Sequence, residues 1–229
     1  MLKLVDGADV LVENFKVGGL AKYGLDYDSL KARNPRLVYC SVTGFGQTGP
    51  YAHRAGYDLM IQAMSGIMDL PPQRLGVAFA DIFTGVYGVI GVQAALAQRE
   101  RTGLGQHVDM ALLDSMMGVL GNQAMNYLTT GVAPHRLGNS HPNIVPYQEF
   151  AASDGHIILA CGNDGQFERL CTLLDFPPDV LDRNRTNAER AANRNELVAQ
   201  IAAAMARFTR DDLLGALEKE GIPAGPINT

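Results

Sequence analysis

Short apolar runs alternate with longer segments of helical spacing along the first part of the chain. The runs that predict strands are 10–12, 36–42 and 107–112. Segments in which apolar residues or glycines follow a helical period lie between and after them, at 16–35, 57–68, 80–101 and 113–131. Strands that alternate with helices predict a parallel sheet with crossover helices, which is the α/β class.

The segment 80–101 is the longest predicted helix. It is apolar on most faces and carries small residues throughout, so we expect it to be buried between layers. We count no apolar run of membrane-spanning length and no signal peptide at the N-terminus, and therefore expect no membrane partner.

The pattern changes after residue 132. Residues 133–148 are rich in Pro, Asn and Gly and predict a linker or active-site loop. A hairpin follows at 148–162, with its turn at Asp154–Gly155, and then two helices, 196–208 and 210–221, the second with Thr209 as N-cap and Gly221 past its end. The predicted organisation is a large α/β domain with a Rossmann-like parallel sheet (1–132), the linker (133–148) and a small α+β domain (149–229).

Composition narrows the possible functions. The 229 residues are 47% hydrophobic and 19% charged, with a net charge of -5 and mixed-sign charge clusters, so a nucleic-acid-binding face is excluded. Three cysteines without a CxxC pair predict reduced thiols and a cytoplasmic location. The five histidines show no i, i+4 pair, so we expect no metal site.

Three glycines, Gly44, Gly46 and Gly49, form a G-x-G-x-x-G pattern directly after a predicted strand. A dinucleotide-binding loop would continue into a helix, but Pro50 follows at once, and the acid about twenty residues on, Asp69, lies in a turn. A dinucleotide site is therefore disfavoured. A glycine loop that lines another ligand pocket remains the prediction, because glycines permit close backbone approach.

The segment GQHVDMALLDSMMG contains two acids. Asp109 lies within the predicted strand, where a local hydrogen bond or salt bridge is its expected role. Asp114 follows the strand where a helix begins, at the edge at which α/β sheets bind ligands. An N-cap is the competing interpretation of Asp114, and Asp81 at the start of the long helix is an obvious cap as well.

Seven segments in order carry a resemblance to a known family. They are ADVLVENF, LVYCSVTGFGQTGPY, AGYDLMIQAMSG, ADIFTGVYGVIGVQAAL, TGLGQHVDMALLDS, GNSHPNIVPYQEF and GIPAGPIN. Together they resemble the family III CoA-transferases, which include formyl-CoA and carnitine CoA-transferases. Members are usually much longer. The chain begins almost directly in a strand and ends in the loop GIPAGPINT, so we expect a fragment that lacks the family's first strand and helix and its C-terminal return to the large domain.

The resemblance implies a reaction. Asp114 matches the family's nucleophilic aspartate, which attacks an acyl-CoA thioester to give a mixed anhydride and then an aspartyl-CoA thioester, from which the incoming acid collects CoA. This is covalent catalysis. The resemblance implies no permanently bound cofactor, coenzyme A thioester as a substrate, and a homodimer whose subunits interlock.

Further positions follow from the resemblance. Those expected to contact CoA are Asn14, Phe15, Lys22, Gly44 and Gly46, and those expected to form the substrate loop are Tyr57, Asn139 and His141. Lys16-Val17 replaces the family's frequent Arg-Pro, a departure at the CoA contacts. Residues 140–146 lack the glycine-rich lid of formyl-type enzymes and are more similar to dicarboxylate-handling relatives.

Two alternatives remain. The α-methylacyl-CoA racemases share the fold and shuttle a proton between a histidine and an aspartate. Asp81 matches the aspartate, but Tyr57 stands in place of the histidine, and a tyrosine of pKa about 10 is a poor base near neutral pH. The other alternative is a non-catalytic CoA-binding fragment.

Overall fold

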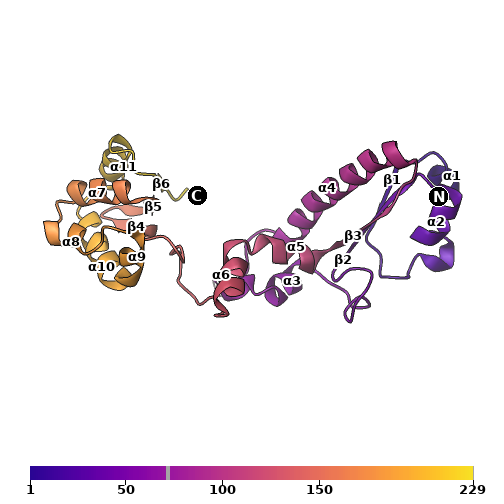
Figure 1. Cartoon of the computed structure of the whole chain (residues 1–229), viewed down its shortest axis with the longest axis horizontal. Coiled ribbons are helices and arrows are strands. Elements are labelled where there is room, and N and C mark those ends of the chain that lie inside the picture. Colours follow the sequence, from indigo (N-terminus) through magenta and orange to yellow (C-terminus); the bar gives the residue numbers. More distant parts are fainter. Residues whose placement is uncertain (71–72, 229) are drawn as a thin grey trace. The chain divides into compact units, whose positions relative to one another are not determined.

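The computed structural model describes residues 1–70 and 73–228 and divides the chain into two compact units. The first comprises Met1–Arg136 and the second Leu137–Thr229. Each unit has a three-stranded sheet (Figure 1). Two clusters of buried hydrophobic residues lie in the first unit and one in the second.

The sheet of the first unit is parallel. Its strands are β1 (Val10–Glu13), β2 (Val38–Thr43) and β3 (His107–Ala111), in the order β1-β2-β3. The register pairs Val12 with Cys40 and Cys40 with Val108. The three strands and the α/β class predicted from the sequence are thus confirmed. Strand β1 is a partly exposed edge strand, with Val12 64% exposed.

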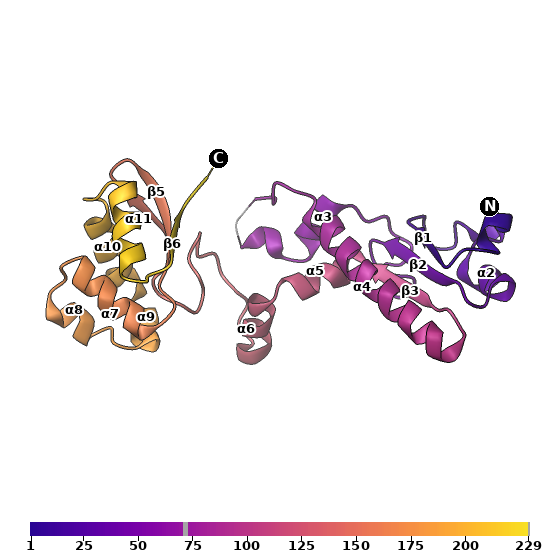
Figure 2. The ribbon, with the colours of Figure 1, turned by 90° about the horizontal axis from the view of Figure 1, so that it is seen from above.

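A 24-residue helix, α4 (Phe79–Thr102), packs along one face of this sheet, as the view from above shows (Figure 2). Two glycines set the packing distance. A Cβ atom at Gly91 would lie 2.9 Å from Val108 Cγ1, and one at Gly88 would lie 3.7 Å from Met110 Cγ. The glycines therefore allow the helix axis to approach β3 more closely than larger residues would.

The expectation that α4 is buried between layers is wrong for this chain. The sheet covers one side of the helix, while Ile82, Val86, Val89 and Ile90 are 50–59% exposed. Among the described residues, α4 is also long and apolar enough to cross a membrane by length and composition alone, with a mean hydropathy of 1.5 over 18 residues, contrary to the count made from the sequence. Helices in soluble cores meet the same criterion.

The remaining helices of the first unit are short. They are α1 (Leu2–Val5), η1 (Ala21–Tyr23), α2 (Tyr27–Arg33), α3 (Asp58–Met64), η2 (Ile67–Asp69), α5 (Leu112–Val119) and α6 (Asn122–Thr130). Two predicted helices are each divided, because Gly66 and Gly121 adopt positive φ values of 85° and 50° that interrupt a right-handed helix. Helix α1 was not predicted.

The second unit pairs an antiparallel sheet with helices. Strands β4 (Tyr147–Ala152) and β5 (Gly155–Ala160) form the predicted hairpin, and β6 (Ala224–Pro226) adds to β5, where the sequence indicated only a loop. The helices are α7 (Asp164–Leu173), α8 (Pro178–Asp182), α9 (Asn187–Ala192), α10 (Arg194–Met205) and α11 (Arg210–Lys219). The first three were not predicted. Thr209 caps α11 as expected, accepting from Asp212 N at 3.3 Å.

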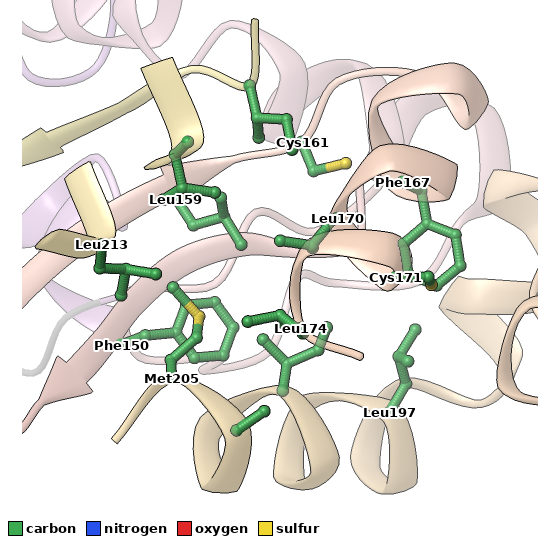
Figure 3. Close-up of a cluster of buried hydrophobic side chains, with 14 of the residues drawn as sticks. Phe150, Leu159, Cys161, Phe167, Leu170, Cys171, Leu174, Leu197, Met205 and Leu213 are labelled. Carbon is green, nitrogen blue, oxygen red and sulfur yellow. The ribbon is translucent and has the colours of Figure 1, made fainter. Parts of the chain in front are cut away.

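The core of this unit lies between the hairpin and the helices (Figure 3). Phe150 and Leu159 from the sheet meet Phe167 and Leu170 of α7 and Leu197 of α10, all 3% exposed or less. The three cysteines of the chain are free, as predicted. Burial raises the pKa of the Cys161 thiol to about 12 and that of Cys171 to about 11.

Candidate active site

A cavity of about 490 Å³ opens in the first unit where β1 and β2 end and α4 begins. Residues from five segments line it, among them Asn14, Phe15, Gly44, Arg54, Tyr57 and Asp81. The carboxyl end of a parallel sheet is where α/β proteins bind ligands, so the position agrees with a substrate site. Four of the residues predicted from the sequence are thus brought together.

Two glycines bring the loops that form this cavity into contact. A Cβ atom at Gly44 would lie 2.5 Å from the Cα atom of Gly56, closer than real Cβ atoms approach backbone. The loop after β2 and the segment before α3 therefore touch backbone to backbone. The G-x-G-x-x-G pattern is followed by turns and not by a helix until Asp58, in agreement with the rejection of a dinucleotide loop.

Arg54 places a guanidinium group in the wall of the cavity. Its Cζ lies 4.0 Å from the centre of the Tyr51 ring, and Tyr51 packs edge-on against Phe45 with ring centres 5.5 Å apart. Within the described residues Arg54 forms no salt bridge. A cation held in place by an aromatic stack is suited to binding a phosphate or carboxylate.

A buried carboxylate joins α3 to the start of α4. Asp58 accepts hydrogen bonds from Gln62 Nε2 at 2.7 Å and from Ala80 N at 2.8 Å. Asp81 follows in the first turn of α4 and faces the cavity. Desolvation, and secondarily the charge of Asp58, raises the pKa of Asp81. Asp81 is not the N-cap predicted from the sequence, because the helix begins at Phe79 with Ala78 as its N-cap.

Asp114 lies in the first turn of α5, directly after β3. It is exposed, and it is not the N-cap: that position belongs to Ala111, and the helix begins at Leu112. Leu112 lines the cavity, whereas Asp114 itself is outside the lining. The competing interpretation of Asp114 as a cap is therefore wrong, and its carboxylate is left available to a ligand. A negative charge in the first turn is stabilised by the helix dipole.

The other positions predicted in this unit lie outside the cavity lining. Asp109 accepts a hydrogen bond from Gln47 N at 2.9 Å, the local structural role expected of it. Gly46 adopts a φ of 82° beside the Asp109 carboxylate, outside the cavity. Lys22 lies over the Tyr23 ring, its Nζ 4.9 Å from the centre, and is also outside the cavity lining.

Asn139 and His141 belong to the second unit. The Asn139 side chain donates to Glu149, whose other oxygen lies 2.8 Å from His156 Nδ1. His141 stacks on Tyr147 with ring centres 5.2 Å apart. Burial, and secondarily the charge of Arg194, lowers the pKa of His141.

Sequence reasoning missed Arg54 and Asp58. An i, i+4 pair of Asp58 and Gln62 at a helix start was a usable signal for the second, whereas the stacking of Arg54 depends on how the turn folds. No group of three or more His, Cys, Asp or Glu side chains able to hold a metal occurs within residues 1–70 and 73–228.

Known proteins resemble the chain over its whole length. It is 54% identical to a succinate--glutarate CoA-transferase of Agrobacterium fabrum over 234 residues, covering 99% of this chain and 58% of that protein. It is 41% identical to an acetyl-CoA:oxalate CoA-transferase of Acetobacter aceti, covering 99% of this chain and 60% of that protein. Each relative is thus matched over less than two thirds of its own length.

A solved structure is also similar to the chain. A CAIB/BAIF family protein from Brucella suis shares 61% identity with a TM-score of 0.82, covering all of this chain and 62% of that one. The profile of CoA-transferase family III matches residues 1–229. The chain belongs to CoA-transferase family III.

Proposed function

We propose that the protein transfers coenzyme A from an acyl-CoA thioester to a carboxylic acid, with Asp114 as the nucleophile. The observation that carries this proposal is the exposed carboxylate in the first turn of α5, directly after β3 and two residues beyond a wall of the cavity. Family membership and CoA-transferase relatives support it.

In the proposed reaction an Asp114 oxygen attacks the thioester carbonyl carbon, the C–S bond breaks, and CoA leaves as the thiolate. The thiolate then attacks the aspartyl carbonyl of the mixed anhydride, which releases the donor acid and leaves an aspartyl-CoA thioester. The acceptor carboxylate attacks that carbonyl, the C–S bond breaks, and CoA leaves again as the thiolate, which gives a second mixed anhydride. The thiolate finally attacks the acceptor's acyl carbon in this anhydride, which forms the new acyl-CoA and frees the Asp114 carboxylate. Four acyl transfers thereby replace one difficult exchange.

The cavity supplies groups for the CoA thioester. Phe15 and the backbone of Gly44 offer apolar contact and close approach, and the Arg54 guanidinium offers a positive charge to an anion. We infer C4 and C5 dicarboxylates as the acids exchanged, since a 54% identical relative is named for succinate and glutarate. The cytoplasmic location and the homodimer stay predictions.

Trapping with hydroxylamine tests the proposal. The protein is incubated with succinyl-CoA and hydroxylamine, and we expect a hydroxamate on Asp114, detected by peptide mass spectrometry. Asp109→Asn is the matched control, because Asp109 serves a local hydrogen bond and should leave the trapping at Asp114 intact. Asp114→Asn should abolish it. Absence of the adduct from folded, CoA-binding protein would refute the nucleophile.

A further inference from the structure

A backbone N–H group in the wall of the cavity has no hydrogen-bond partner. It belongs to Gly44, the first residue after β2, which is buried and lines the cavity. No acceptor for this N–H group occurs among the residues that the structure describes, whereas the carbonyl of the same residue accepts from Leu113 N at 3.1 Å. Buried backbone N–H groups are nearly always paired, so this one indicates that the cavity binds a group with an acceptor atom.

The end of β1 explains why this N–H group is unpaired and shows where it points. Val38 N donates to the residue before β1 and Tyr39 N to the residue before β3, because successive residues of a middle strand bond to its two neighbours in turn. Even-numbered residues of β2 therefore direct their N–H groups toward β1. The alternation extends to Gly44, since the residue before it still pairs with β3 and the peptide plane is trans. Strand β1 pairs only as far as Glu13, so this N–H group faces the space beyond its end, which Phe15 of the same cavity borders.

The glycine loop around this N–H group is held in place from three sides. Leu113 N bonds to the carbonyl of Gly44, and Gln47 N donates to Asp109 Oδ2 at 2.9 Å. The third side is closed by Gly56, where a Cβ atom would lie 2.4 Å from Gly44 Cα. A donor that is fixed before the ligand arrives needs no reorganisation when charge develops on the ligand.

Charge and burial in the cavity select the atom that this donor binds. Lys16 and Arg54 in the lining are cationic, which favours an oxygen with negative charge. Asp81 is the one carboxylate among the described lining residues, and desolvation raises its pKa. Arg54 is exposed whereas Gly44 is buried. A bulky phosphate can therefore reach Arg54, but the N–H group of Gly44 is suited to a single slender oxygen such as that of a carbonyl.

The same glycine joins the cavity to the helix that carries the proposed nucleophile. Leu113, whose N–H group bonds to Gly44 O, directly precedes Asp114, and Leu112 lines the cavity. The glycine loop and the first turn of α5 are thus in direct contact. An acyl group within reach of the Asp114 carboxylate therefore lies beside this loop.

We propose that the Gly44 N–H group binds the carbonyl oxygen of the acyl-CoA thioester and stabilises the oxyanion that forms when Asp114 attacks. As an Asp114 oxygen adds to the carbonyl carbon, the π electron pair of the C=O bond moves to this oxygen. The pair returns when the C–S bond breaks and CoA leaves as the thiolate. The inference rests on the proposed function, which supplies the thioester and the nucleophile. It goes beyond the contact with CoA expected from the resemblance, because it gives a backbone donor a catalytic role.

Replacing the amide of Gly44 with an ester tests this role. Gly44→glycolic acid, made by ligating a synthetic segment into the full chain, exchanges the N–H group for an oxygen and leaves the rest of the residue unchanged. Gly49→glycolic acid is the matched control. Gly49 also follows a threonine, and its N–H group is likewise without a partner among the described residues, but it lies outside the cavity lining.

Two unreactive analogues of succinyl-CoA measure the hydrogen bond. In the ketone analogue a CH2 group replaces the thioester sulfur, and in the second analogue CH2 replaces the carbonyl group as well. In NMR of the ¹⁵N-glycine-labelled protein, the Gly44 amide proton signal, assigned by its loss in Gly44→glycolic acid, should move downfield with the ketone and not with the second analogue. The ketone should bind about fivefold more weakly to Gly44→glycolic acid than to Gly49→glycolic acid. An equal response to both analogues, or equal ketone affinity of the two ester variants, would overturn the inference.

Trapping at Asp114 separates this inference from the proposed function. With succinyl-CoA and hydroxylamine, the Asp114 hydroxamate should form about a hundredfold more slowly in Gly44→glycolic acid than in Gly49→glycolic acid, because one oxyanion donor contributes about that factor. If Asp114 is trapped equally fast in both variants, the transferase proposal holds and the role of Gly44 is wrong. If the Gly44 signal responds to the ketone while Asp114 is never trapped, the carbonyl site is real and the acyl transfer at Asp114 is wrong.

Discussion

Replacing Arg190 with methionine should destabilise the second unit and release the loop that carries His141. The guanidinium is fully buried and donates to Val145 O at 2.7 Å, Asn184 O at 3.1 Å, Arg185 O at 3.0 Å and Asp164 Oδ1 at 2.7 Å. Methionine retains the apolar stem but offers no donor.

The expected loss of stability follows from the acceptor groups that lose the guanidinium of Arg190. Three carbonyl groups lose a charged donor, and each such hydrogen bond contributes about 1.5–3 kcal/mol, whereas the Asp164 carboxylate, 59% exposed, regains water. Part of the carbonyl cost is also recovered by hydration or rearrangement. We therefore expect a loss of about 4 kcal/mol in the free energy of unfolding of this unit, within the range for a broken buried ion pair.

Hydrogen exchange measured by mass spectrometry provides the assay, since it reports on each unit separately. Peptides from α7 and α9 should exchange about a thousandfold faster in Arg190→Met, the equivalent of about 4 kcal/mol. The control is Arg185→Met, which removes a 67% exposed partner of Asp182 and should cost less than about 1 kcal/mol. Equal exchange in the two variants would refute the reasoning.

Three further predictions concern the glycine contact, a half-buried histidine and the thiols. Gly44→Ala should weaken CoA binding about tenfold or more by calorimetry, because a Cβ atom would meet Gly56 at 2.5 Å, whereas Gly7→Ala, with open space around its Cβ, should bind as the unmodified protein does. Burial lowers the pKa of His107, so as the pH falls below about 6.5 this histidine is protonated in the unfolded chain before it is protonated in the folded one. The free energy of unfolding, measured by urea titration, should therefore decrease below that pH, and it should decrease less in His107→Gln. Cys161 and Cys171, with pKa values raised to about 12 and 11, should resist iodoacetamide at pH 8 until urea unfolds the chain, and rapid labelling of the native protein would contradict this.

The strands and the long helix could be predicted because their signals are local. A run such as VYCSV is apolar and β-branched whichever chain surrounds it, and the glycines that end α4 and α6, Gly103 and Gly131, both adopt positive φ as C-caps. The pairing of β6 with β5 could not be predicted in this way, because it joins Leu159 to Ala224 across a long stretch of chain. The exposure of α4 depends likewise on what packs against it and not on its own sequence.

The hydrogen bonds within the loop that carries His141 could not be predicted from the sequence, for a different reason. The segment SHPNI contains a histidine, but nothing in its letters shows that two backbone N–H groups converge on one ring nitrogen. That convergence depends on the dihedral angles of the residues after Pro142, which the supporting side chains Arg194 and Asn187 hold in place. The protonation of His141 is thus a property of the folded unit.

The position of Asp114 shows how much chemistry depends on where a helix begins. Had the helix started one residue after the aspartate, its carboxylate would accept a backbone N–H and be occupied as a cap. The helix starts at Leu112 instead, with the main chain of Ala111 at the cap and Leu113 N bonded to Gly44 O at 3.1 Å. Gly44 O in the glycine loop thus accepts the hydrogen bond of one backbone N–H group in the first turn of α5. The carboxylate of Asp114 remains exposed for the reaction that we propose.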